Sequence, residues 1–246
     1  MPSYAVLIAA AGRSRRFNDP SYKKPFISLR QKPVWLHSVE RFQKRSDVKQ
    51  IIILISPEDQ EDFMTRFGPN VAVLGLDVVL GGDQRSDSVC NGLKHVKDDI
   101  EFVAIHDAAR PCVSEDDIEA VFEVAKKTRA AILATPVTST LKKVGEANKV
   151  ETTVARQGLW EGQTPQVFQK KLLLEAFQQI GDQKPTDEAQ LVELAGGEVS
   201  IVKGSPLNIK ITSREDLRLA QACMDAAPKP KFDAPLHPFA DDNLFR

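Results

Sequence analysis

Short apolar segments alternate with segments of helical character through the first half of the chain, and this alternation restricts the possible folds more than any other feature. The apolar segments are short, and several are rich in β-branched residues, which is typical of buried parallel strands. They span Tyr4–Ala10, Ile51–Ile55, a stretch within Val71–Leu80, Phe102–Ile105 and Ala130–Ala134. Predicted helices lie between them, at Pro33–Lys44, after Ser56 and Pro57, at Gln84–Val96 and after Ser114. The pattern favours an α/β fold of three layers, with a mainly parallel (mixed) twisted sheet covered by helices on both faces.

The second half departs from this alternation. Thr138–Ala155 is polar and rich in threonine, has a turn-like centre, and is predicted to form a protruding β-hairpin. The remaining predicted elements are helices near Gln169–Ile180 and Asp187–Leu194, strands at Val199–Val202 and Leu207–Ile211, and a last helix capped by Ser213. Residues 227–246 are rich in proline and charge. We therefore expect one domain over residues 1–226, followed by a tail without a packed core.

The charge balance and the cysteines narrow the classes of function. The 33 Lys and Arg residues against 34 Asp and Glu residues give 33 − 34 = −1, which argues against a nucleic-acid binder. No apolar run approaches the roughly 20 residues that cross a bilayer, and no signal peptide is recognisable at the start, so no membrane partner is expected. Cys90, Cys112 and Cys223 are widely spaced and are interpreted as reduced thiols, which predicts a cytoplasmic protein.

The loop after the first strand is unusually basic. It begins with Ala10, Ala11 and Gly12, and a glycine there lets backbone N–H groups approach a phosphate closely. Five cations follow within one loop: Arg13, Arg15, Arg16, Lys23 and Lys24. Such a density of donors suits a triphosphate, whereas neither a Walker P-loop nor a dinucleotide fingerprint is present. A solvated basic loop is the alternative.

A second loop, Gly81–Ser88, contains two adjacent glycines at a predicted strand end. Gly82 would let a flat ligand lie against the backbone, Asp83 could cap the following helix, and Ser88 could bond a base or a sugar. An ordinary capped turn between strand and helix explains the same residues equally well.

A third motif, His106–Pro111, places a carboxylate directly after an apolar strand. Asp107 is a hard oxygen ligand of the kind that Mg²⁺ prefers, and one carboxylate can suffice because Mg²⁺ keeps waters and takes substrate phosphates. A structural pair between Asp107 and Arg110 is the alternative. His106 is expected to be packed or hydrogen-bonded rather than catalytic.

A fourth set of residues is uninformative when each is taken alone. It comprises Thr140, Arg156, Thr164, Thr186 with Asp187, and Lys210. Thr186 and Asp187 are a plausible helix cap. Lys210 interrupts a predicted apolar strand, and its side chain is therefore expected to point into a site.

Taken together, the order and spacing of these motifs resemble those of the 2-C-methyl-D-erythritol 4-phosphate cytidylyltransferase family, from about Tyr4 to Met224. The motifs are A-A-G-x-x-x-R at 10–16, K-P at 24–25, G-G-D-x-R-x-D-S-V at 81–89, H-D-A-A-R-P at 106–111, R-x-G-L-W at 156–160, T-P-Q at 164–166, T-D-E at 186–188 and N-I-K-I-T at 208–212. The resemblance implies a nucleotide-diphospho-sugar transferase-like fold. It also implies that CMP passes from CTP to the polyol phosphate with release of pyrophosphate, aided by Mg²⁺ or another divalent cation.

The resemblance assigns roles to individual residues. Arg16 and Lys24 would be catalytic, and Asp107 would hold the metal ion. The remaining roles are nucleotide binding by Ala10, Ala11, Gly12, Gly82, Asp83, Ser88 and Ala108, and binding of the polyol phosphate by Thr140, Arg156, Thr186 and Lys210. The hairpin would cross to a second subunit of a homodimer, so that Thr140 and Arg156 serve the partner's site.

One position departs from the family's pattern. The residue before N-I-K is usually an aspartate that bonds the polyol hydroxyls, and here it is Leu207. This keeps open the related ribitol-5-phosphate cytidylyltransferases. A catalytically inactive nucleotide-binding homologue is the other alternative, although one set of residues present together argues against it: Arg16, Lys24, Asp107, Arg156 and Lys210.

Overall fold

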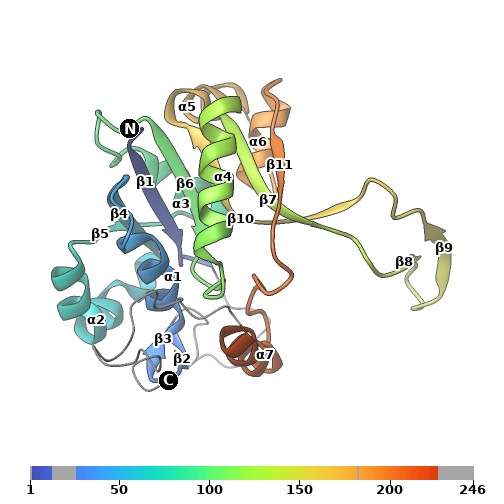
Figure 1. Ribbon diagram of the computed structural model, residues 1–246, viewed down its shortest axis with the longest axis horizontal. Coiled ribbons are helices and arrows are strands. Elements are labelled where there is room, and N and C mark those ends of the chain that lie inside the picture. Colours follow the sequence, from blue (N-terminus) through green and yellow to red (C-terminus); the bar gives the residue numbers. More distant parts are fainter. Residues whose placement is uncertain (1, 13–25, 182, 227–246) are drawn as a thin grey trace, which may run out of the picture.

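A seven-stranded sheet forms the centre of the molecule in the computed structural model, which describes residues 2–12, 26–181 and 183–226 (Figure 1). The strand order is β11-β7-β10-β6-β1-β4-β5. The strands are β1 (Tyr4–Ala9), β4 (Val48–Ile55), β5 (Asp77–Leu80), β6 (Phe102–Asp107), β7 (Ala130–Pro136), β10 (Trp160–Gln169) and β11 (Ser200–Lys203). Within this described sheet β10 alone is antiparallel to its neighbours, β6 and β7. The predicted mainly parallel, mixed sheet is therefore confirmed.

Helices cover both faces of the sheet, because successive residues of its central strands are buried on opposite sides. Tyr4, Val6 and Ile8 of β1 belong to the core cluster under α1 (Val34–Gln43), α2 (Gln60–Leu74) and α4 (Glu115–Thr128). Ala5 and Leu7 belong to the opposite cluster, under α3 (Arg85–Leu93), α5 (Lys170–Gln179) and α6 (Glu188–Leu194). This arrangement confirms the three-layer architecture.

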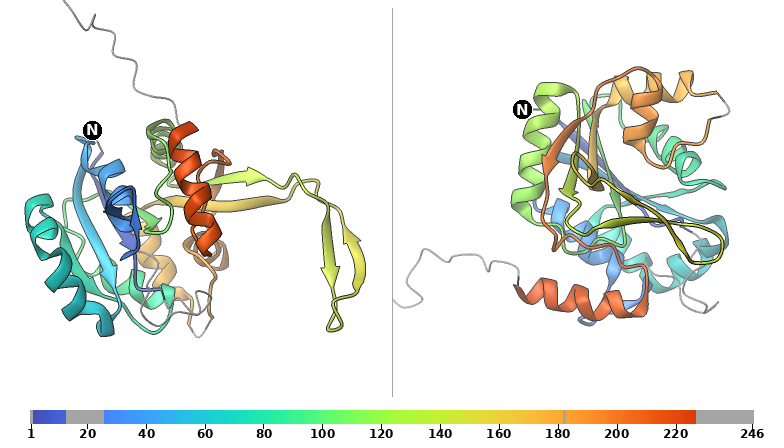
Figure 2. Two further views of the ribbon diagram at one scale, coloured as in Figure 1. Left: turned by 90° about the horizontal axis from the view of Figure 1, so that it is seen from below. Right: turned by 90° about the vertical axis from the view of Figure 1, so that its right-hand side faces the viewer.

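The hairpin predicted at Thr138–Ala155 protrudes from the body. Its strands β8 (Leu141–Val144) and β9 (Val150–Val154) pair antiparallel with each other and with no strand of the main sheet. Figures 1 and 2 show this arm extending away from the layers on the ends of β7 and β10. Its polar sequence agrees with its position, because its side chains are almost all exposed.

A smaller layer closes one end of the molecule. The short strands β2 (Ser28–Leu29) and β3 (Lys32–Pro33) form a hairpin, and α7 (Arg214–Ala226) begins after Ser213, whose hydroxyl accepts a hydrogen bond from the backbone N–H of Asp216. The predicted cap is therefore confirmed. This end is held together by a third apolar cluster, which includes Leu29, Val34, Cys112, Ile211, Ala220 and Cys223.

Two further predicted strands had different outcomes. A strand was predicted to fall within Val71–Leu80, and β5 at Asp77–Leu80 confirms this; the first part of the stretch is the last turn of α2. Leu207–Ile211 is not a strand: Asn208 donates its backbone N–H to the carbonyl of Ser205, and Ile211 donates to that of Ala109. The backbone groups of this segment are thus satisfied by a turn and by a neighbouring loop instead of a sheet.

The short strands β2 and β3 and one strand of the main sheet, β10, were not predicted, and one helix start differs in detail. The segment of β10 is polar at most positions and contains Pro165, so its sequence lacks the alternation of a half-buried strand. Ser56 precedes Pro57 as predicted, but the first turn is a 3₁₀ helix, η3 (Pro57–Asp59), before α2 begins. Within the described residues, we find no helix both long and apolar enough to cross a membrane.

Candidate active site

The predicted nucleotide loops meet at the carboxyl edge of the central strands. Backbone pairing continues one residue beyond the strands: Ala10 donates to Leu54 at 2.9 Å, Ala108 to Ala9 at 3.1 Å and Gly81 to Ile55 at 2.7 Å. These bonds place Ala10, Gly81 and Ala108 along one edge of the sheet. In open α/β sheets, ligands bind at this edge.

The glycine-rich loop is packed too tightly for larger residues. A Cβ atom built on Gly81 would lie 2.6 Å from Oγ of Ser88 and 2.7 Å from Cβ of Ala11, so the first and second predicted loops touch here. Oγ of Ser88 accepts the N–H of Gly82 at 3.1 Å and donates to the carbonyl of Gln84 at 3.0 Å. Ser88 therefore shapes the loop that carries Gly82.

Asp83 does not cap the following helix, contrary to the prediction. The cap of α3 is Gln84, which forms a capping box with Asp87, whose carboxylate accepts the N–H of Gln84 at 3.0 Å. Asp83 is exposed one residue earlier. The sequence alone does not decide whether Asp83 or Gln84 is the N-cap, because the two are adjacent and either could precede the first turn of α3.

Asp107 ends β6 and is surrounded by three cations. Nζ of Lys210 lies 2.7 Å from its Oδ2, Nε of Arg110 lies 3.6 Å from the same oxygen, and Nε of Arg85 lies 3.7 Å from Oδ1. Asp107 is only 7% exposed. Burial alone would raise the pKa of its carboxyl, but Lys210, Arg85 and Arg110 outweigh burial and hold that pKa well below its usual range. The carboxylate is charged, and Lys210, which was expected to point into a site, contacts it although Lys210 is not on a strand.

His106 is part of the scaffold under Asp107. Its Nε2 lies 3.0 Å from the carbonyl of Arg110, and its Nδ1 lies 3.1 Å from Oγ1 of Thr164, which accepts the N–H of Asp107 at 3.0 Å. These partners assign the proton to Nε2, because a carbonyl can only accept. Burial lowers the pKa of His106 to about 4. A neutral, buried imidazole supports the expected packing role.

A second group of residues fixes the segment that carries Lys210. Nη1 of Arg110 donates to the carbonyl of Asn208 at 2.7 Å, and Nδ2 of Asn208 donates to the carbonyl of Thr164 at 2.9 Å. Arg110 therefore makes the anticipated pair with Asp107 and also anchors the loop two residues before Lys210. Asn208 was not predicted as a site residue, because nothing in N-I-K-I-T marks the asparagine as buried.

Thr186 and Asp187 stand at the start of α6, as predicted for a cap. Oδ1 of Asp187 accepts the N–H of Gln190 at 2.9 Å, and Thr186 is exposed beside it. The next residue, Glu188, lies 2.5 Å from Nη1 of Arg85 through its Oε1. Arg85 thus connects α6 with Asp107. No role was predicted for Arg85 or Glu188, although both belong to motifs of the family pattern, because a contact between two residues so far apart in sequence leaves no local pattern.

Thr140 and Arg156 lie on the arm and are exposed. The pairing of Leu141 with Val154 places both at the base of the hairpin, where the Arg156 guanidinium donates to the carbonyl of Thr138. Figure 2 shows the arm directed away from the body, so the chain does not bring these two residues to its own Asp107. Arg16 and Lys24, with Arg13, Arg15 and Lys23, lie outside the described residues.

The donor set around Asp107 fits one Mg²⁺ ion. The described residues contain no group of three or more histidine, cysteine, aspartate or glutamate side chains that could hold a metal. Mg²⁺ needs no such cage, because it binds one or two carboxylates and completes its shell with waters and substrate phosphates. Asp107, a charged carboxylate at the loop edge, meets that requirement.

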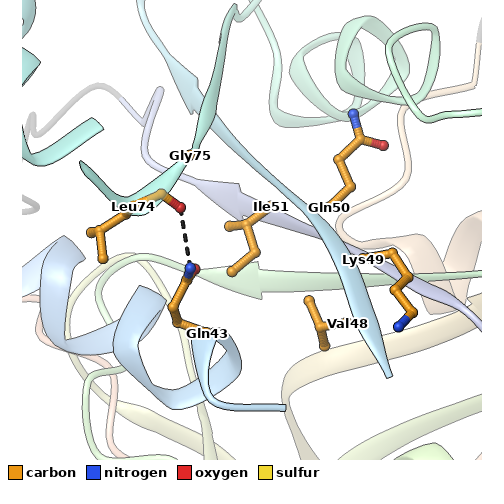
Figure 3. Close-up of a pocket in the computed structure, with 7 residues that line it drawn as sticks. All are labelled: Gln43, Val48, Lys49, Gln50, Ile51, Leu74 and Gly75. Carbon is orange, nitrogen blue, oxygen red and sulfur yellow. Dashed lines mark hydrogen bonds between the residues drawn. The ribbon is translucent and has the colours of Figure 1, made fainter. Parts of the chain in front are cut away.

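Two hollows lie at the other ends of the strands. One, of about 90 Å³, is lined by Gln43 at the end of α1, by residues at the start of β4 and by Leu74 and Gly75 at the end of α2. Figure 3 shows Gln43 bonded across it to the carbonyl of Leu74, at 3.1 Å. The other, of about 540 Å³, is lined by residues around Glu101 and Lys170, before β6 and at the start of α5. Neither includes a residue of the Asp107 cluster.

Comparison with known proteins gives a consistent result. The model of the family described as 2-C-methyl-D-erythritol 4-phosphate cytidylyltransferase matches residues 4–226. Relatives with that name from Rhodopirellula baltica and Bacillus pumilus are each 39% identical to this chain, over 235 and 226 residues; both alignments cover 91% of the chain, and they cover 95% and 97% of the relatives. The crystal structure of the protein of that name from Thermus thermophilus superposes with a TM-score of 0.76 at 28% identity, covering 92% of this chain and all (100%) of the other.

Proposed function

The chain belongs to the 2-C-methyl-D-erythritol 4-phosphate cytidylyltransferase family, and we propose that it transfers CMP from CTP to 2-C-methyl-D-erythritol 4-phosphate through the Asp107 cluster. The products are CDP-methylerythritol and pyrophosphate, on the non-mevalonate route to isoprenoid precursors. The observation that carries the proposal is the contact of Lys210 with Asp107 at the edge where the nucleotide loops meet.

The chemistry needs positioning and charge more than a protein nucleophile. A phosphate oxygen of the polyol phosphate is already an anion, and it attacks the α-phosphorus of CTP in line with the leaving pyrophosphate. A divalent cation on Asp107 would neutralise phosphate charge when bound. We assign to Lys210, which lies against Asp107, the binding of the attacking phosphate. Arg16 and Lys24 would stabilise the charge that develops on the α-phosphate and the pyrophosphate.

The glycine-rich loop suits the base and the ribose. The close packing of Gly81 on Ala11 and Ser88 leaves the backbone of Gly82 at the edge of the sheet, where Asp83 is exposed. Ala10, Gly12 and Ala108 complete this edge from the neighbouring strands. We assign nucleotide binding to these residues.

A homodimer would complete the site. The arm and its base expose apolar side chains that a monomer leaves in water: Val144, Val150, Val154, Leu159 and Trp160. We propose that this surface packs on a second copy of the chain, and that Thr140 and Arg156 there bind the polyol phosphate in the partner's site. The near-neutral net charge and the three free cysteines support a cytoplasmic enzyme without a nucleic-acid partner.

The side chain of Leu207 takes part in the apolar packing of the protein. It packs against the cluster under α7 that includes Ile211 and Cys112. The polyol hydroxyls therefore need another partner, and the exposed Thr186 at the start of α6 is the one we propose.

An assay with two polyol phosphates tests the function. The protein is incubated with CTP and Mg²⁺ together with either 2-C-methyl-D-erythritol 4-phosphate or ribitol 5-phosphate, and pyrophosphate is measured. We expect rapid release with the methylerythritol compound and slow release with the ribitol compound. The proposal is wrong if ribitol 5-phosphate is preferred, or if CTP binds without release of pyrophosphate.

A further inference from the structure

The guanidinium of Arg85 is shared between two carboxylates of the body. Its Nη1 lies 2.5 Å from Oε1 of Glu188, and its Nε lies 3.7 Å from Oδ1 of Asp107. The three residues come from different elements: the start of α3, the start of α6 and the end of β6. The shorter contact is to Glu188, so Arg85 is held mainly by a residue outside the nucleotide loops.

Glu188 is fixed more firmly than an ion-pair partner at a surface would be. It is 1% exposed, and the turn that carries it is fastened to β10 by Gln166. Nε2 of Gln166 donates to Oδ2 of Asp187 at 2.9 Å, and its Oε1 accepts the N–H of Ala189 at 3.1 Å. One glutamine side chain thus bonds the residues on either side of Glu188, and the carboxylate has a defined place from which to hold Arg85.

A role in stability alone is a weak explanation for this pair. Removing two charges from water is costly, and replacing a buried ion pair by apolar residues of similar size is often neutral or stabilising. Oε2 of Glu188 is also buried and has no hydrogen-bond partner among the described residues. The pair of Arg85 and Glu188 is therefore better explained by its effect on the position of Arg85 relative to Asp107.

Lys210 and Arg85 approach Asp107 through different oxygens and at different distances. The closest contact of Lys210 is with Oδ2, at 2.7 Å, whereas Arg85 comes closest to Oδ1 and stays 3.7 Å from it. If Arg85 lost its contact with Glu188, its guanidinium could approach Oδ1 to hydrogen-bonding distance, because charge-assisted pairs of this kind are short and strong. A metal ion would then have to displace a cation from each oxygen.

We propose that Glu188 is a positioning residue that holds Arg85 back from Asp107 and so keeps Oδ1 available to the divalent cation. This inference rests on the proposed function, because it presumes that Asp107 holds the metal. Residues behind a metal ligand commonly change metal affinity by about 10- to 100-fold when they are mutated. Glu188 would act in this way through Arg85, without touching the metal ion.

The test measures Mn²⁺ binding in the presence of a non-hydrolysable CTP analogue, by electron paramagnetic resonance of free Mn²⁺. We expect Glu188→Gln to weaken Mn²⁺ binding by about tenfold or more. Glu193→Gln, on the exposed side of α6, is the matched control and should bind as the wild type does. Circular dichroism and thermal unfolding check that each variant is folded.

A double variant separates this role from a purely structural one. In Arg85→Met with Glu188→Met, the competing guanidinium is gone, and binding should return to within about threefold of the wild type. The inference is overturned if Glu188→Gln binds Mn²⁺ as tightly as the wild type, or if the folded double variant binds as weakly as the single one. If the wild type itself binds no Mn²⁺ with the analogue, the proposed function fails first and the inference with it.

Discussion

Nζ of Lys210 and Oδ2 of Asp107 lie 2.7 Å apart, although the two residues come from opposite halves of the chain. The contact joins the edge that carries the nucleotide loops to the segment after β11. Arg110 supports both partners, since it lies beside Asp107 and bonds the carbonyl of Asn208. In the proposed function, this contact would bring the carboxylate that holds the metal ion of CTP close to the cation that binds the polyol phosphate.

Replacing Lys210 tests this contact. Lys210→Met keeps the length of the side chain but removes the cation that would meet the attacking phosphate, and we expect turnover to fall by about 100-fold or more. Lys203→Met, on the exposed side of β11, is the control and should leave turnover unchanged. The rate of pyrophosphate release at saturating CTP is the measurement. A Lys210→Met enzyme with wild-type turnover would remove Lys210 from the site.

Mixing two inactive variants tests whether the arm serves a second subunit. Lys210→Met damages the body, and Arg156→Ala damages the arm. In a hybrid dimer, one site combines an intact body with an intact arm. After full subunit exchange, about half of the dimers are hybrids with one intact site each, so about a quarter of wild-type activity should return. Exchange is verified with differently tagged subunits, and no recovery after verified exchange would show that sites are not shared.

The sequence was most informative for features that depend only on residues near one another in the chain, such as buried strands and helix caps. The strands around Tyr4 and Phe102 were predictable because buried parallel strands are continuously apolar, and Ser114 and Ser213 were recognisable as caps. Lys210 was expected to point into a site because it interrupts an apolar segment predicted to be a strand. It contacts Asp107, but its segment is held by Arg110 and a turn, not by a sheet.

Contacts between distant residues could not be predicted from local patterns. Arg85 and Glu188 are ordinary charged residues at helix starts, and only the packing of α3 against α6 shows that they form a buried pair. The strand β10 was missed because its sequence lacks a strand pattern; only its pairing with β6 and β7 shows that it is a strand. The motifs of the family pattern include Arg85, Glu188 and Asn208, but the contacts that these residues make could not be predicted from the motifs.

The buried imidazole of His106 predicts a pH dependence of stability. Its pKa is about 4 in the folded protein and 6.5 for an ordinary histidine, so below pH 6.5 the unfolded chain binds a proton that the folded chain does not. The contribution of neutral His106 to the free energy of unfolding is therefore complete above pH 6.5. As the pH falls toward 4, this contribution is lost, which lowers the free energy of unfolding by up to about 3 kcal/mol.

Urea unfolding of the wild type and of His106→Gln measures this effect. The glutamine cannot protonate, so the free energy of unfolding of the variant should fall less steeply between pH 6.5 and 4.5, whatever its stability at neutral pH. Equal slopes for the two proteins would show that His106 does not titrate differently on folding.

The most direct test of the account is pyrophosphate release by Asp107→Asn with CTP, Mg²⁺ and 2-C-methyl-D-erythritol 4-phosphate. The amide keeps the size of the side chain but removes the charge that would hold the metal ion and pair with Lys210. We predict that the folded variant releases pyrophosphate at least about 100-fold more slowly than the wild type, and that wild-type release requires the polyol phosphate. Release by Asp107→Asn at the wild-type rate would contradict the claim that this carboxylate is the centre of the site.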